Sequence, residues 1–202
     1  MRKDVKIWQR ALRDAEAYLG AIDGDFGKGT RRASFEAANL KEAQPSSFAD
    51  VTMINHKATR NRPITGSLRA KLAASVVAVY GPTATIAVYS GGQDRKGAGS
   101  RRTGSVRHDD YGGGGKAADC YVYVEGRKIY GVELAKLGQY WLGMGYGGVG
   151  LEMATGGIHL DEWVKPPKGG GMFWTYKYSD RKPWGATVRA MLEAGHRGEL
   201  PK

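Results

Sequence analysis

Two histidines and one aspartate occupy positions from which they could hold a metal ion together. His108 ends a basic loop, and Asp119 opens a predicted strand after the glycine run at 112–115. His159 lies in a second predicted strand, next to Asp161 on the same face. Strands and their ends hold side chains rigidly enough for a three-ligand site with one open coordination position. Each residue alone is more typical of an ordinary surface histidine or strand-end aspartate, and their combination suggests a metal site without establishing one.

Other chemistries have signatures that this sequence lacks. None of its four histidines belongs to a His-Glu-x-x-His motif, so the helical zinc-protease arrangement is absent. There is no Gly-x-Ser-x-Gly elbow, and Cys120 lies in an apolar strand, where we expect a buried small residue. The P-loop and the dinucleotide fingerprint are also missing. These absences argue against serine or cysteine nucleophiles and against nucleotide binding.

The charge of the chain indicates a polyanionic partner. The net charge is +11 and the isoelectric point is near 9.7, which suits nucleic acid, an anionic membrane or an acidic polymer such as a bacterial wall. No apolar stretch is long enough to span a membrane. The first residues, MRKDVKIWQRALRD, contain no apolar signal-peptide region, so we expect synthesis in the host cytoplasm and another route to any external target.

Apolar periodicity and turn residues predict the order of helices and strands. A helix is expected at 5–19, a short helix from about Thr30, and a polar linker at about 41–50. Farther along, the pattern predicts helices at 66–80, 133–144 and 185–194 (stopped by Gly195), strands at 84–90, 147–153, 157–163 and 172–178, and a hairpin turn at Glu125–Gly126. Residues 91–118 are expected to form a long basic loop.

The N-terminal segment resembles a known wall-binding module. Residues 5–39 are similar to the small helical peptidoglycan-binding domain, whose pattern joins two helices through a Tyr-x-Gly-x-Ile-Asp-Gly-x-Phe-Gly turn. The matching residues are Tyr18, Gly20, Ile22, Asp23, Gly24, Phe26, Gly27 and Thr30. The resemblance implies a wall-binding helical domain at 1–45.

A second resemblance covers residues from about 60 to 163. This part looks like the zinc peptidases that include D-alanyl-D-alanine carboxypeptidases and phage L-alanyl-D-glutamate endolysins. The matching residues are Ser105, His108, Ala118, Asp119 and His159. The resemblance implies that His108, Asp119 and His159 bind Zn2+. The first two ligands are farther apart than is usual in the family, and the glycines at 112–115 would absorb the extra residues in a loop.

The general base is open at this stage. Family members often carry an acid three residues before the last histidine, but Gly156 stands there in this chain. The candidates are Glu152 and Asp161, with a slight preference for Asp161 because it shares the strand face of His159. Asp161 could equally be a hydrogen-bond partner that supports the histidine.

Three residues near the first motif are candidates for binding substrate. Arg102 and Arg107 could pair with carboxylates of a peptidoglycan stem peptide, because a guanidinium matches a carboxylate in geometry. The alternative for each arginine is a solvated basic loop. Ser105 could orient substrate or could simply end a turn.

Together these patterns predict an α+β protein with two domains. We expect a small N-terminal helical bundle at 1–45, and a zinc peptidase domain at 46–202 with a mainly antiparallel sheet packed by helices. The expected function is a monomeric phage-type endolysin that cleaves a peptide bond in bacterial peptidoglycan. The alternatives are a D-alanyl-D-alanine carboxypeptidase and a non-catalytic wall-binding protein. A nucleic-acid partner is not expected because no nucleic-acid motif is present, whereas electrostatic contact with an anionic envelope fits the charge.

Overall fold

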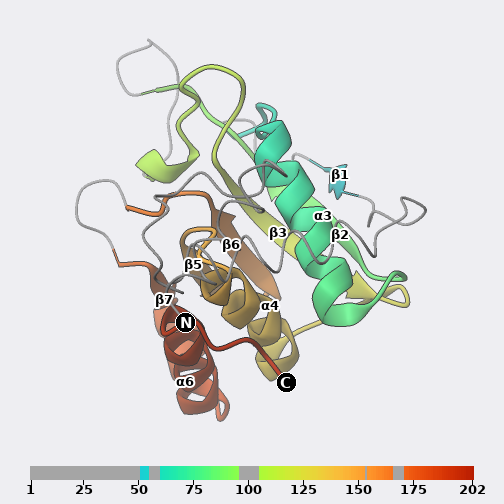
Figure 1. Cartoon of the computed structure of the whole chain (residues 1–202), viewed down its shortest axis with the longest axis vertical. Coiled ribbons are helices and arrows are strands. Elements are labelled where there is room, and N and C mark those ends of the chain that lie inside the picture. Colours follow the sequence, from blue (N-terminus) through green and yellow to red (C-terminus); the bar gives the residue numbers. More distant parts are fainter. Residues whose placement is uncertain (1–50, 55–59, 96–104, 153, 166–170) are drawn as a thin grey trace, which may run out of the picture. The chain divides into compact units, whose positions relative to one another are not determined.

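The computed structural model describes residues 51–54, 60–95, 105–152, 154–165 and 171–202. The predicted wall-binding domain at 1–45, the linker at about 41–50 and Arg102 lie outside these residues. The described chain folds into a mixed sheet with helices packed against it (Figure 1). No helix in this part is both long and apolar enough to cross a membrane.

The sheet has seven strands and is mainly antiparallel. Together with the helices that pack against it, it confirms the predicted mixture of helices and strands. Its order is β1 (Val51–Met53), β2 (Thr85–Ser90), β3 (Ala117–Val124), β6 (Gly157–Asp161), β5 (Val149–Glu152) and β7 (Phe173–Thr175), with β4 (Arg127–Lys128) paired to β3. The β1–β2 and β5–β7 pairs are parallel, and the other pairs are antiparallel. The long antiparallel pairs β2–β3, β3–β6 and β5–β6 form the centre of the sheet.

The two faces of the sheet carry different kinds of side chain. Side chains alternate between the faces along each strand. Cys120 of β3 lies opposite Ile158 of β6, which lies opposite Leu151 of β5, and all three are buried in the apolar core. The neighbouring residues Asp119 and His159 therefore point to the other face, which we call the site face.

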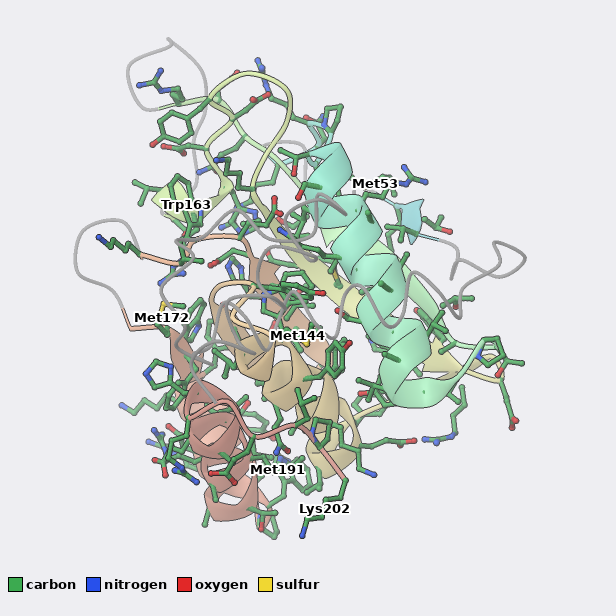
Figure 2. The ribbon with its side chains drawn as sticks, viewed as in Figure 1. Met53, Met144, Trp163, Met172, Met191 and Lys202 are labelled. Atoms are coloured by element: carbon green, nitrogen blue, oxygen red, sulfur yellow. The ribbon has the colours of Figure 1, made fainter. Side chains whose placement is uncertain are left out.

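Helices cover the apolar face. α3 (Gly66–Tyr80) packs against β1, β2 and β3, and α4 (Gly131–Gly143) packs against β5 and β6. α6 (Gly185–His196) packs against α4, and the short α5 (Lys177–Asp180) precedes it. Trp141 of α4 is fully buried, and Met144, which follows α4, is also in the core (Figure 2).

Most of the expected elements are confirmed within a few residues. The helix predicted at 66–80 is α3; the side chain of Thr65 accepts a hydrogen bond from the Leu68 N–H at its start, and Gly81 follows its end. The predicted hairpin joins β3 and β4 through Glu125 and Gly126, which both have positive φ angles, as a tight hairpin turn requires. Cys120 is buried, as expected.

Two expectations about the elements are corrected, and one strand was not expected. The helix predicted to stop at Gly195 continues to His196. Gly195 is needed for close packing against α4 and not to end the helix, since a Cβ there would lie 2.4 Å from the Gln139 carbonyl oxygen. The segment 172–178 is a strand only to Thr175, after which α5 begins. β1 was not predicted, because a three-residue edge strand is too short to show a period.

A half-buried carboxylate ties the end of β6 to the start of α3. Glu162 accepts hydrogen bonds from the hydroxyls of Thr65 (2.9 Å) and Ser67 (2.6 Å), and Lys71 donates to it at 2.5 Å. Burial alone would raise the pKa of Glu162, but the bonds from Lys71 and the two hydroxyls outweigh burial and lower it. The ionised carboxylate therefore contributes to stability and also faces the positive end of the α3 dipole.

We expect Glu162→Gln to lower the free energy of unfolding by about 1–2 kcal/mol at pH 7. Because the pKa of the folded state is lowered, the stabilisation is fully present above the ordinary glutamate pKa and is lost as the pH falls through the folded value. Urea unfolding at several pH values measures the difference, which should vanish in acid. Glu193→Gln, on the exposed side of α6, is the matched control. A constant difference at all pH values would contradict this account.

Candidate metal centre

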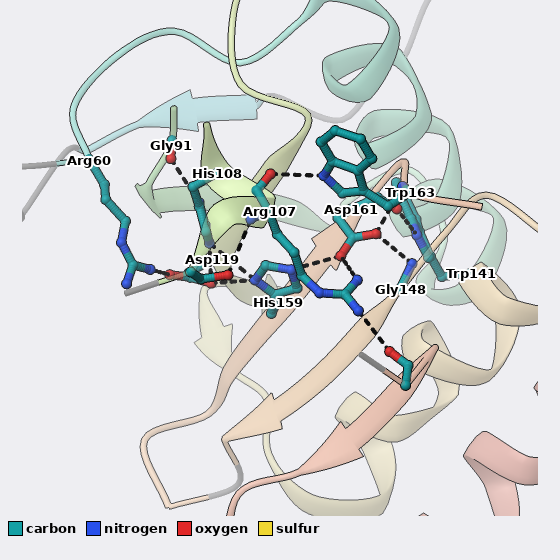
Figure 3. A network of polar contacts seen from close by, with 12 residues as sticks. Arg60, Gly91, Arg107, His108, Asp119, Trp141, Gly148, His159, Asp161 and Trp163 are labelled. Carbon is teal, nitrogen blue, oxygen red and sulfur yellow. Dashed lines mark hydrogen bonds and ion pairs between the residues drawn. The ribbon is translucent and has the colours of Figure 1, made fainter. Parts of the chain in front are cut away.

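His108, Asp119 and His159 converge at one buried point on the site face (Figure 3). Nε2 of His108 lies 3.2 Å from Nδ1 of His159. Oδ1 of Asp119 lies 2.8 Å from that Nδ1 and 3.4 Å from the Nε2. The three residues are 0–7% exposed. The structure thus brings together the three residues that the sequence predicted as ligands.

The sheet register creates this convergence. Asp119 of β3 lies directly opposite His159 of β6, and His159 lies opposite Gly150 of β5. The row continues to Ser90 of β2 on one side and to Trp174 of β7 on the other. Directly opposed residues in antiparallel strands have Cβ atoms about 5 Å apart, so the two side chains must meet.

The glycine run brings His108 back to this row. His108 ends a 3-10 helix, η1 (Val106–His108), and the chain then turns through the glycines before β3 begins. The Asp110 side chain accepts hydrogen bonds from the N–H groups of Gly112 and Gly114 and shapes the turn. A Cβ at Gly115 would lie 2.5 Å from the Cα of Gly92, so this close return needs a glycine. The predicted loop role of the glycines is confirmed.

The ring nitrogens that face away from the cluster have partners of their own. Nδ1 of His108 lies 2.8 Å from the carbonyl oxygen of Gly91, which can only accept, so His108 carries its proton on Nδ1. Nε2 of His159 lies 3.0 Å from Oδ2 of Asp161. A proton on this Nε2 is thereby held by the carboxylate. Each ring therefore turns its other nitrogen toward Asp119. Outer hydrogen-bond partners of metal-binding histidines typically fix the orientation of the ring in this way.

Asp161 is fully engaged by its neighbours. Its Oδ1 accepts the backbone N–H groups of Gly148 at 2.6 Å and Trp163 at 3.0 Å. Its Oδ2 accepts Nη1 of Arg107 at 2.5 Å besides the contact with His159. The carboxylate is 0% exposed and points at the ring nitrogen that faces away from the cluster. This geometry favours the supporting role over the role of general base.

Arg107 supports Asp161 from within the protein. Its Nη2 donates to the carbonyl of Gly171 at 2.7 Å, and its guanidinium carbon lies 4.8 Å from the centre of the Trp174 ring. Trp163 donates its ring N–H to the Arg107 carbonyl at 2.9 Å (Figure 3). Arg107 is buried by these contacts. The guanidinium expected to bind substrate is therefore already committed to Asp161 and Gly171.

A second arginine supports the aspartate of the cluster. Nη1 of Arg60 lies 3.0 Å from Oδ2 of Asp119, which leaves Oδ1 to face the two histidines. Sequence reasoning missed this contact because Arg60 lies in a polar, aperiodic stretch 59 residues before Asp119. Trp174 was also missed as a site residue, although its ring centre lies 5.1 Å from that of His159.

Burial and hydrogen bonding shift the protonation of the cluster. Burial would raise the pKa of Asp119, but the two histidines hold it well below its ordinary value. Burial would lower the pKa of His159, but hydrogen bonds to Asp119 and Asp161 outweigh burial and raise it. Burial lowers the pKa of His108, opposed by Asp119. A divalent ion would therefore compete with a proton for Nδ1 of His159.

The donor set fits a metal ion. Two imidazole nitrogens and a carboxylate oxygen lie 2.8–3.4 Å apart. Ligand atoms around a tetrahedral zinc ion are separated by roughly 3.3 Å, given metal–ligand bonds near 2.0 Å. His108, Asp119 and His159 thus form a buried group that could hold a metal ion.

The other predicted residues lie close to this centre or are accounted for locally. The hydroxyl of Ser105 accepts the Arg107 N–H at 3.3 Å and caps η1, which favours its role in a turn. Glu152 ends β5 opposite Gly157, on the same face as His159 and one row farther along the sheet.

Comparisons with protein-family models, curated proteins and solved structures give no match for this chain.

We expect Asp161→Asn to weaken binding of a divalent ion by about 10–100-fold while the fold is kept. The amide cannot hold the Nε2 proton of His159 as a carboxylate does, so the ring loses its fixed orientation. Competition with a chromophoric chelator measures the affinity, and far-UV circular dichroism checks the fold.

Two variants frame this measurement. His159→Ala, which removes one of the three candidate ligands, should abolish binding at the same ion concentrations. Asp180→Asn, on the exposed α5, should leave the affinity unchanged. An affinity in Asp161→Asn equal to that of the unaltered chain would show that Asp161 does not support the site.

Proposed function

We propose that the chain is a zinc-dependent peptidase that cleaves peptide bonds in bacterial peptidoglycan. The observation that carries the proposal is the convergence of His108, Asp119 and His159, with the outward nitrogen of each ring held by a separate partner. Two neutral imidazoles and one carboxylate form a ligand set typical of catalytic zinc, which keeps a further position for water or substrate.

The residues of the chain divide the work of such a site. When bound, Zn2+ supplies Lewis acidity, which polarises a peptide carbonyl and makes water acidic enough to react near neutral pH. His108, Asp119 and His159 bind the ion. Gly91 and Asp161 orient the two rings, and Arg60 restrains Asp119 through its second oxygen. This support fixes the ligand atoms before substrate arrives.

Glu152 is the better of the two candidates for the general base. The two carboxylate oxygens of Asp161 accept hydrogen bonds from four donors, and Asp161 lies on the side of the His159 ring that faces away from the cluster. Glu152 is half-buried on the site face, one row from His159, and its Oε2 lies near Gly157. In the proposed reaction Glu152 takes the proton from the attacking water and delivers it to the leaving amine.

The choice of substrate rests on the sequence. The motifs around His108, Asp119 and His159 resemble those of wall-cleaving zinc peptidases, and residues 5–39 resemble a peptidoglycan-binding domain. A net charge of +11 suits an anionic wall. We therefore favour a phage-type endolysin whose residues 1–45 hold it on the wall. A D-alanyl-D-alanine carboxypeptidase would use the same site on a terminal residue.

We expect Glu152→Gln to lower turnover of purified peptidoglycan by roughly 10²–10⁴-fold. The amide keeps the size of the side chain but cannot accept the proton of water, so zinc affinity should stay unchanged. Release of new amino groups from the wall measures turnover, and chelator competition measures zinc.

The same assay tests the function itself. The unaltered chain should release amino groups, a chelator should stop the release, and added Zn2+ should restore it. Release that persists after the ion has been removed would contradict a zinc peptidase. Normal turnover in Glu152→Gln would leave the function intact and assign the proton transfer to another group.

A further inference from the structure

The site face continues beyond the metal centre as a stack of aromatic rings. Tyr121 lies two residues after Asp119 on β3 and faces the same side. Its ring is stacked on that of Tyr89, with centres 4.3 Å apart and planes 24° from parallel. Rows two residues apart on a strand are separated by about 7 Å. The stack therefore begins within one row of the proposed zinc ligands.

Lys128 places an ammonium group on this stack. It pairs with Tyr123 at the end of the β3–β4 hairpin, one row farther from the cluster. Its Nζ lies 3.5 Å from the centre of the Tyr121 ring and 5.6 Å from that of Tyr130. Contact with Tyr121 is the diagonal contact between neighbouring strands. The side chain thus points along the face toward the metal centre, and two rings hold its charge by cation–π attraction.

This ammonium is available in a way that the nearby guanidinium groups are not. Arg60 and Arg107 form ion pairs with Asp119 and Asp161 inside the site. Among the described residues, no carboxylate lies within ion-pair distance of Lys128. Lys128 is half-buried, so an anion that reached it would be partly shielded from water.

Glu152 bears the opposite charge on the same face. It shares the row of Tyr121 through Gly157, which lies between them on β6. A substrate that crosses this row therefore meets a carboxylate on one strand and the ammonium over another. Such an arrangement rejects an anionic group near Glu152 and accepts one near Lys128.

We propose that Lys128 binds a carboxylate of the substrate peptide, about 7 Å from the metal ligands along the sheet, or one to two extended residues from the scissile bond. The inference rests on the proposed function and deepens it. It assigns the substrate as a peptide with a free carboxylate on one side of the cleaved bond, held by a charge-assisted hydrogen bond from an ammonium fixed between Tyr121 and Tyr130.

The test uses stem peptides with free and amidated carboxylates. Lys128→Met should raise KM for the free acid by about 10–100-fold, the loss expected for one charge-assisted hydrogen bond. It should leave KM for the fully amidated peptide unchanged. Peptides amidated at the C-terminus alone or on the side chain alone show which carboxylate is bound. A terminal carboxylate would favour a carboxypeptidase, and an internal one an endopeptidase.

Two further variants serve as controls. Lys136→Met makes the same change on the exposed side of α4, which packs on the other face of the sheet, and should affect neither peptide. Lys128→Arg keeps a cation and should retain a lower KM for the free acid than for the amide. A purely structural role of Lys128 in the hairpin would not produce this preference.

Equilibrium binding of the same peptides in the presence of chelator separates this inference from the proposed function. If no peptide is cleaved but Lys128→Met weakens binding of the acid and not of the amide, the function fails and the carboxylate site stands. If Lys128→Met affects the acid and the amide equally, or affects neither, Lys128 is a structural latch of the hairpin and the inference is overturned.

Discussion

The antiparallel register of β3 and β6 is the constraint on which the rest of the site depends. It sets Asp119 directly opposite His159 and, one residue away, Cys120 opposite Ile158 on the apolar face. A slip by one residue would send the polar pair into the core and the apolar pair to the site face. The burial of Cys120, Ile158 and their neighbours against α3 and α4 therefore fixes the register, and the register places the cluster.

Burying so much charge is unfavourable unless every group has a partner. Asp119 and Asp161 are both nearly or fully buried, and each is matched by an arginine and by ring or backbone N–H groups. Removing one partner of such a network typically costs 3–5 kcal/mol, because a buried charge is left uncompensated. The network restricts the rings of His108 and His159 to one arrangement. The same contacts that offset the cost of burial thus also orient the proposed ligands.

The sequence contained much of the fold because local signals were strong. Leu68, Leu72 and Val76 mark one face of α3, and Gly81 ends it. The grouping of His108, Asp119 and His159 could also be predicted, because the motifs around them resemble those of a known family. The orientation of the two histidine rings could not be predicted. This orientation decides whether Asp161 is a general base or a partner that supports His159. The contacts of Arg60 and Trp174 depend on pairing between distant segments, and no local pattern reports such pairing.

The most direct test of the account is 15N NMR of the histidine rings during titration with Zn2+. One equivalent per chain should shift Nε2 of His108 and Nδ1 of His159 as these atoms bind the ion. Nδ1 of His108 and Nε2 of His159 should stay protonated, because Gly91 and Asp161 hold those protons. A response at the opposite nitrogens, or rings that do not respond to one equivalent, would contradict the claim that this cluster is a metal centre.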